Sequence, residues 1–141
     1  MEITNQIEAY LNSQPEPKQT ELRALDQRIH RLMPHCEQWF FDGKNDAGKQ
    51  VTHPTIGYGN FTITYKDGHT KAIFRIGLLA TTSGLAVYLM GYEDKKFLAA
   101  TYGPTIGKAK VGTYGITFKS VNDIHLEVLD AAIQHRAEAV N

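Results

Sequence analysis

An alternating stretch in the middle of the sequence constrains the fold most. In residues 61–66, Phe, Ile and Tyr alternate with Thr and Lys, the period-two pattern of a strand with one buried face. Asp67-Gly68 follows, and these two residue types tolerate the positive φ angles of a tight hairpin turn. Two apolar runs, 72–78 and 85–90, come next, with a Thr-Thr-Ser-Gly turn at 81–84 between them. We therefore predict three neighbouring antiparallel strands joined as a meander.

Helical patterns lie on both sides of these strands. Apolar residues recur at helical spacing in residues 3–11 and 17–33, and Pro15 and Pro34 end the two repeats. A closing helix is predicted in residues 121–133, where the apolar arc is wide enough to touch two neighbours. Helices that flank a run of strands favour an α+β fold over repeated βαβ units.

Two shorter strands, at 38–41 and 114–118, complete the expected sheet. We predict one domain over residues 1–141, a two-layer α+β fold. In it, a single antiparallel sheet of about five strands is packed by the N-terminal helices and a C-terminal helix. A chain of 141 residues falls within the usual size of one domain.

The balance of charged residues indicates which kinds of partner the protein is expected to lack. Lys plus Arg and Asp plus Glu both number 15, and no basic run stands out, so we expect no nucleic-acid partner. No apolar stretch approaches the length of about 20 residues that a spanning helix needs, so we expect no membrane partner. The start of the chain does not resemble a signal peptide, and Cys36 is the only cysteine. We expect a cytoplasmic protein, either a monomer or a small homo-oligomer.

A Gly-rich loop is predicted at residues 102–113. Its Gly-Pro-Thr-Ile-Gly-Lys-Ala sequence fails as a phosphate-binding P-loop because the glycine spacing is short and Ala109 stands where a hydroxyl should bind Mg²⁺. Lys108 and Lys110, which follow Gly107, could still offer ammonium groups and backbone N–H donors to an anion. The alternative is that both lysines are only solvated.

The tetrapeptide Pro-Thr-Ile-Gly occurs at 54–57 and again at 104–107, in both cases before a predicted strand. In the first copy Gly57-Tyr58-Gly59 could bring the backbone close to a ligand, although Tyr58 could equally be a buried structural residue. The resulting hypothesis is a cleft for a small anionic metabolite between residues 54–60 and 104–112. Its ligand-binding residues would be Gly57, Tyr58, Gly107, Lys108 and Lys110.

Metal and catalytic motifs are not apparent in the sequence. The six histidines include no pair at metal-binding spacing, so we predict no dedicated histidine metal site. Cys36 stands beside His35, but adjacent side chains on an extended segment point to opposite faces, which makes this a poor nucleophile–base pair. We therefore expect a binding or accessory role more than an enzyme.

Several segments carry a resemblance to a known family: Ile-Glu-Ala-Tyr-Leu before a proline, Gly-Tyr-Gly-Asn-Phe, Tyr-Lys-Asp-Gly, Leu-Ala-Val-Tyr-Leu-Met-Gly, and a Gly-Lys-x-Lys-x-Gly turn before a strand and a closing helix. They occupy residues 7–11, 57–61, 65–68, 85–91, 107–112 and 121–129. In order and spacing they resemble the YdhG-like domain family, a bacterial family largely catalogued as a domain of unknown function.

This resemblance implies terminal helices packed on one antiparallel sheet, an arrangement compared with frataxin. At least one member of the family has been described as an intracellular iron chaperone, so the resemblance also implies iron as a candidate ligand. Two functional hypotheses follow. The first is a small intracellular binding or accessory protein of the YdhG-like type that handles iron. The alternative is a module that binds a small anionic metabolite between the two Gly-rich loops.

Overall fold

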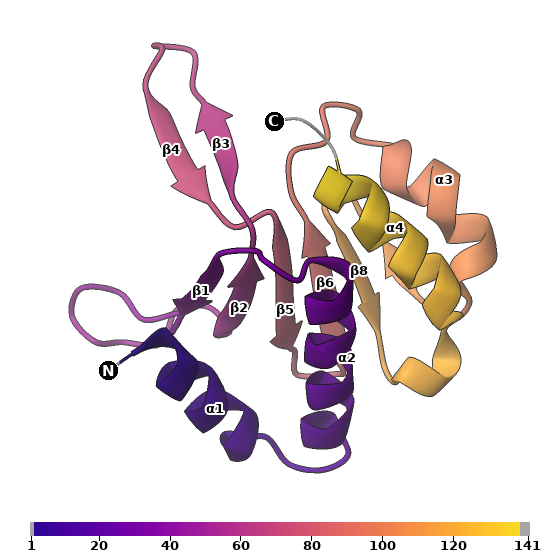
Figure 1. Ribbon diagram of the computed structural model, residues 1–141, viewed down its shortest axis with the longest axis horizontal. Coiled ribbons are helices and arrows are strands. Elements are labelled where there is room, and N and C mark those ends of the chain that lie inside the picture. Colours follow the sequence, from indigo (N-terminus) through magenta and orange to yellow (C-terminus); the bar gives the residue numbers. More distant parts are fainter. Residues whose placement is uncertain (1, 139–141) are drawn as a thin grey trace.

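The computed structural model describes residues 2–138 and centres on a six-stranded antiparallel sheet in the order β1-β2-β5-β6-β8-β7. A separate two-stranded hairpin, β3–β4, projects from one end of it (Figure 1). The strands are β1 (Gln38–Phe41), β2 (Thr55–Tyr58), β3 (Phe61–Thr64), β4 (Thr70–Ile73), β5 (Ile76–Ala80), β6 (Leu85–Leu89), β7 (Lys110–Val111) and β8 (Gly115–Phe118).

The helices are α1 (Ile3–Ser13), α2 (Lys18–Leu32), α3 (Phe97–Ile106) and α4 (Leu126–Glu138), with a 3₁₀ turn, η1 (Val121–Asp123), before α4. Helix α2 buries Leu22, Leu25 and Ile29, which share one face because they are three and seven residues apart. Both α2 and α4 pack on β5, and α3 lies beside α4 and β7. The α+β class and the placement of helices at both ends of the chain are confirmed.

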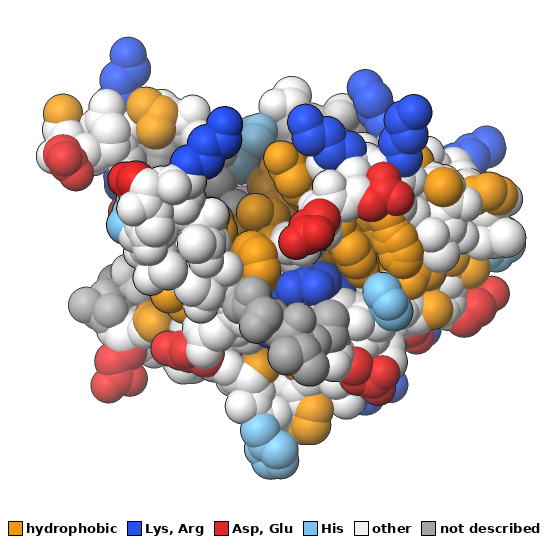
Figure 2. Space-filling model, turned by 90° about the horizontal axis from the view of Figure 1, so that it is seen from above, with side chains coloured by type: hydrophobic (Ala, Val, Ile, Leu, Met, Phe, Trp, Pro, Cys, Tyr) orange, Lys and Arg blue, Asp and Glu red, His pale blue; other side chains and the backbone are white. Residues whose placement is uncertain are grey.

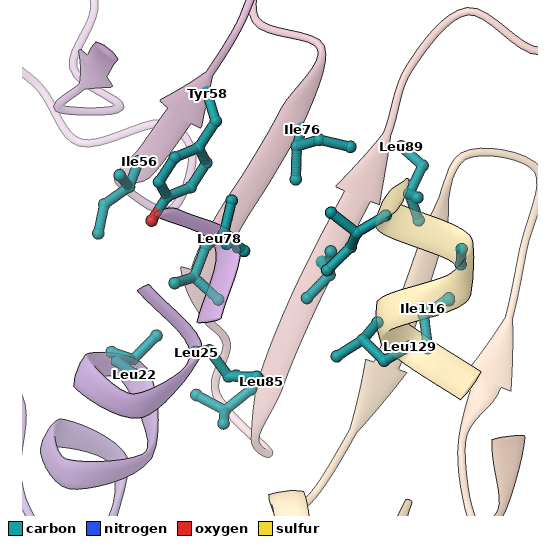
Figure 3. Close-up of a cluster of buried hydrophobic side chains, with 14 of the residues drawn as sticks. Leu22, Leu25, Ile56, Tyr58, Ile76, Leu78, Leu85, Leu89, Ile116 and Leu129 are labelled. Carbon is teal, nitrogen blue, oxygen red and sulfur yellow. The ribbon is translucent and has the colours of Figure 1, made fainter. Parts of the chain in front are cut away.

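The core is organised by a row of side chains directly opposite one another across four strands. Ile56 pairs with Leu78, Leu78 with Val87, and Val87 with Ile116, and all four are fully buried. Figure 3 shows Leu22 and Leu25 of α2 and Leu129 of α4 meeting this apolar surface. Full burial of an aliphatic side chain of this size contributes about 1.5–3 kcal/mol, so this row accounts for much of the stability of the sheet.

The predicted meander forms only in part. Strands β5 and β6 are neighbours, joined by the predicted turn, in which the N–H of Thr81 donates to the carbonyl of Gly84. Residues 61–64 pair with β4 across the predicted Asp67-Gly68 turn, but in a separate hairpin, and β2, which was not predicted as a strand, lies beside β5. The expected single sheet of about five strands is therefore a six-stranded sheet plus a hairpin.

The chain leaves the sheet at Phe74 and Arg75, within what the pattern predicted as one continuous strand. The N–H of Arg75 donates to the carbonyl of Tyr58, while the ring of Phe74 packs over two glycines. A Cβ atom at Gly57 would lie 2.6 Å from Cβ of Phe74, and one at Gly77 would lie 2.8 Å from its Cε1. The glycines thus make room for the aromatic ring, and β4 turns away from the body.

The two Pro-Thr-Ile-Gly copies adopt different structures. Residues 55–57 belong to the buried strand β2, whereas residues 104–106 form the last turn of α3. Helix α3 therefore extends into the segment predicted as a Gly-rich loop. Gly107 ends the helix with a φ of 107°, a conformation that an L-residue rarely adopts.

Candidate functional site

A hollow of about 430 Å³ lies between the hairpin, the segment after β6 and the last turn of α4. Figure 2 looks onto this end of the molecule, where hydrophobic side chains lie in the hollowed centre of the face and both basic and acidic side chains surround them. We call it the Arg136 pocket, and its lining residues are Phe61, Thr62, Ile63, Thr64, Gly91, Tyr92, Glu93 and Arg136.

Arg136 is the most unusual residue of the pocket. Its exposure is 5%, and its Nε atom has no hydrogen-bond partner within residues 2–138. Among the residues that the structure describes, no carboxylate pairs with it. Buried charges in proteins are normally paired, because removing a cation from water is costly. Burial, with the nearby Arg75 guanidinium as a smaller contribution, lowers the pKa of Arg136.

The helix places Arg136 there by its periodicity. Leu129, Ala132 and Ile133 form the buried stripe of α4, and Arg136 is the next position on the same stripe, seven residues after Leu129. Arg136 was not among the site residues predicted from the sequence. The available signal was an arginine on the core-facing stripe of a predicted helix, where an apolar residue is expected.

Two aromatic rings hold the guanidinium. Its Cζ atom lies 5.4 Å from the ring centroid of Phe61 and 5.5 Å from that of Tyr92, within the range of cation–π attraction. The Tyr92 ring packs 4.8 Å from that of Phe97, and the Tyr92 hydroxyl is 3.1 Å from Nδ1 of His135. Burial raises the pKa of Tyr92 to about 12, so its phenol is neutral at physiological pH.

Arg75 joins the base of the hairpin to α4. Its Nε donates to the carbonyl of Asn60 at 3.1 Å, and its Nη1 donates to the carbonyl of Arg136 at 3.1 Å. Arg75 therefore lies beside the backbone of α4 at Arg136, and its charge is near enough to help lower the pKa of the Arg136 guanidinium.

The residues predicted from the sequence are not brought together. Strand β2, with Gly57 and Tyr58, and strand β7, with Lys110, are separated by β5, β6 and β8 in the sheet. At the β7 end, the N–H of Lys108 donates to the carbonyl of Asp123, and that of Gly112 to Gly115. These amides are therefore engaged within the protein, and the hypothesised cleft between residues 54–60 and 104–112 does not form.

Tyr58 occupies a structural position. The side chain is fully buried, and its hydroxyl donates to Oδ1 of Asp26 at 2.5 Å. Burial first, and then the Asp26 carboxylate, raises the pKa of Tyr58 well above its ordinary value. Gly57 lies beneath Phe74, whereas Lys108 and Lys110 are exposed. Tyr58 is therefore a buried structural residue, which is one of the two alternatives that the sequence left open.

Within residues 2–138, no group of three or more His, Cys, Asp or Glu side chains lies close enough to hold a metal ion. Cys36 is half-buried, and burial raises the pKa of its thiol, which keeps it protonated at neutral pH. No helix in the described part of the chain has the length and apolar character to cross a membrane.

Comparison of the chain with known protein families, curated proteins and solved structures finds no match. The resemblance to the YdhG-like family therefore stays a prediction, and the geometry of the Arg136 pocket carries the functional argument.

Proposed function

We propose that this protein binds a small organic anion in the Arg136 pocket. The observation that carries the proposal is Arg136, a residue that is only 5% exposed, has an Nε atom without a hydrogen-bond partner among the described residues, and lines a hollow of about 430 Å³. A hollow of this volume falls within the range of small-molecule sites.

The energetics favour an anion over a neutral ligand. Arg136 has lost much of its hydration, and within residues 2–138 no carboxylate pairs with it in return. A carboxylate that enters the pocket can accept charge-assisted hydrogen bonds from it in surroundings where Coulomb attraction is stronger than in water.

The aromatic walls favour an organic anion over an inorganic one. Phe61 and Tyr92 flank the guanidinium, and Ile63 adds an aliphatic surface to the pocket. An anion with a hydrocarbon part would bury this surface, at about 25 cal/mol per Å² of apolar area removed from water. The anionic-metabolite hypothesis from the sequence is thus kept, with a different place in the fold.

The test compares 3-phenylpropionate with its uncharged amide, 3-phenylpropanamide, by calorimetric titration of the wild type and of Arg136→Met. We expect the carboxylate to bind the wild type at least about tenfold more tightly than the amide, since a hydrogen bond to a charged group contributes about 1.5–3 kcal/mol. Arg136→Met should remove the difference. Arg31→Gln, on the exposed face of α2, is the matched control and should leave it intact.

Equal binding of the acid and the amide by the wild type would contradict the proposal, as would an undiminished preference in Arg136→Met. So would a complete lack of saturable binding of 3-phenylpropionate.

Iron handling, which the family resemblance implies, stays a separate prediction. Anaerobic titration with ferrous iron tests this prediction, and a lack of binding below millimolar concentration would contradict it.

A further inference from the structure

The Arg136 pocket contains a second charge of opposite sign. Glu93, in the turn between β6 and α3, lines the same hollow and is exposed. Within residues 2–138, Glu93 makes no ion pair, so its carboxylate lies beyond ion-pair distance from the Arg136 guanidinium. The cation is therefore buried, the anion is at the surface, and the hollow lies between them.

We propose that the ligand is a zwitterion of the α-amino-acid class, whose carboxylate binds Arg136 and whose ammonium group faces Glu93. The inference rests on the proposed function and specifies its ligand. The residues that line the pocket carry one positive and one negative charge, so a ligand with one of each matches both. A dianion would place surplus negative charge beside Glu93, where like charges repel.

The apolar lining specifies the rest of the ligand. Phe61, Ile63 and Tyr92 border the hollow beside the two charges, and they offer ring faces and an aliphatic surface to a side chain. An amino acid with an aromatic or branched aliphatic side chain would use these walls together with both charged residues. The site would then distinguish such a compound from a simple fatty or aromatic acid by its ammonium group.

The experiment uses pairs of compounds that differ only in that group: L-phenylalanine with 3-phenylpropionate, and L-leucine with 4-methylpentanoate. Each is titrated into the wild type, Glu93→Gln and Glu127→Gln. Glu127 is an exposed carboxylate at the start of α4, the opposite end of the helix from Arg136, so Glu127→Gln is the matched control.

We expect the wild type to bind at least one amino acid up to about fivefold more tightly than its deaminated partner, because an ion pair at an exposed position contributes up to about 1 kcal/mol. In Glu93→Gln the ratio should fall close to one, both by weaker binding of the amino acid and by tighter binding of the acid. Glu127→Gln should keep the wild-type ratio.

Equal binding of both members of each pair to the wild type would overturn the zwitterion inference, and so would an unchanged ratio in Glu93→Gln. In that case the loss of 3-phenylpropionate binding in Arg136→Met would still support the anion site. If Arg136→Met binds every compound as the wild type does, or if no compound binds the wild type, both proposals fail together.

Discussion

The guanidinium of Arg136 packs against the α-carbon of Gly91, so closely that a Cβ atom at residue 91 would lie 2.7 Å from Nη2 of Arg136 and 2.8 Å from Cε1 of Phe61. Gly91 also has a φ of 98°, which L-residues rarely adopt. The pocket thus depends on a residue without a side chain, two positions after the end of β6.

Gly91→Ala should therefore lower the stability of the protein by more than backbone strain alone would lower it. Gly68, in the hairpin turn, is the matched control, because its φ is 91° but nothing lies within 4 Å of a Cβ placed there. A left-handed conformation costs alanine about 1–2 kcal/mol, and this is the loss expected for Gly68→Ala in urea unfolding. Gly91→Ala should lose about 1–3 kcal/mol more through the steric clash. Equal losses in the two variants would contradict this account.

Arg136→Met should raise the free energy of unfolding by about 1 kcal/mol. The substitution removes a desolvated cation, whose burial costs several kcal/mol, and forfeits two cation–π contacts of about 0.5–2 kcal/mol each. Methionine fits the same elongated space. Such a gain in stability with a loss of ligand binding is typical of a residue retained for function. Thermal unfolding measures it, and clear destabilisation would indicate that Arg136 is a structural residue.

Tyr58→Phe tests the structural role of Tyr58 against the ligand-binding role expected from the sequence. Loss of its hydroxyl removes the hydrogen bond to Asp26 and should lower stability by about 1–3 kcal/mol. Binding of 3-phenylpropionate should not change. Tyr114→Phe, at a residue that is 52% exposed, should alter neither property. A binding defect in folded Tyr58→Phe would restore the sequence-based hypothesis.

The ion pair between Arg28 and Asp130 joins α2 to α4 through two hydrogen bonds, of 2.5 Å from Nε and 2.8 Å from Nη2. Both side chains are less than one-third exposed. A double-mutant cycle with Arg28→Met and Asp130→Asn should give a coupling energy of about 1 kcal/mol, since two-point contact and partial burial raise the contribution above that of a typical surface pair. A coupling energy near zero would show that packing alone holds the helices together.

Stability should fall as the pH rises above about 10, the ordinary pKa of tyrosine. Burial raises the pKa of Tyr92 to about 12 and also raises those of Tyr10, Tyr58 and Tyr102. The folded state holds these protons more tightly, so the stabilisation is complete below the unfolded pKa and is lost between about 10 and the folded values. Urea unfolding across this range measures the loss. Tyr92→Phe should make it smaller but not abolish it, and an identical pH profile would exclude Tyr92 as a contributor.

Local patterns in the sequence were enough to predict most of the helices and turns. Helical spacing of apolar residues located α1, α2 and α4, and turn residues located the Asp67-Gly68 hairpin and the β5–β6 connection. These patterns succeed because neighbours in the sequence are neighbours within one helix or hairpin, and their spacing follows from the backbone geometry.

Strand neighbours and the candidate site were decided only in the tertiary structure. The apolar run at 72–78 predicted one continuous strand, but the chain divides there into β4 and β5, so β3 pairs with β4 in the hairpin and β2 lies beside β5. The pocket likewise joins Phe61, Tyr92 and Arg136, which lie on three distant segments. Side-chain periodicity indicates how deeply a position is buried, whereas the partner that buries it depends on long-range packing of the whole chain.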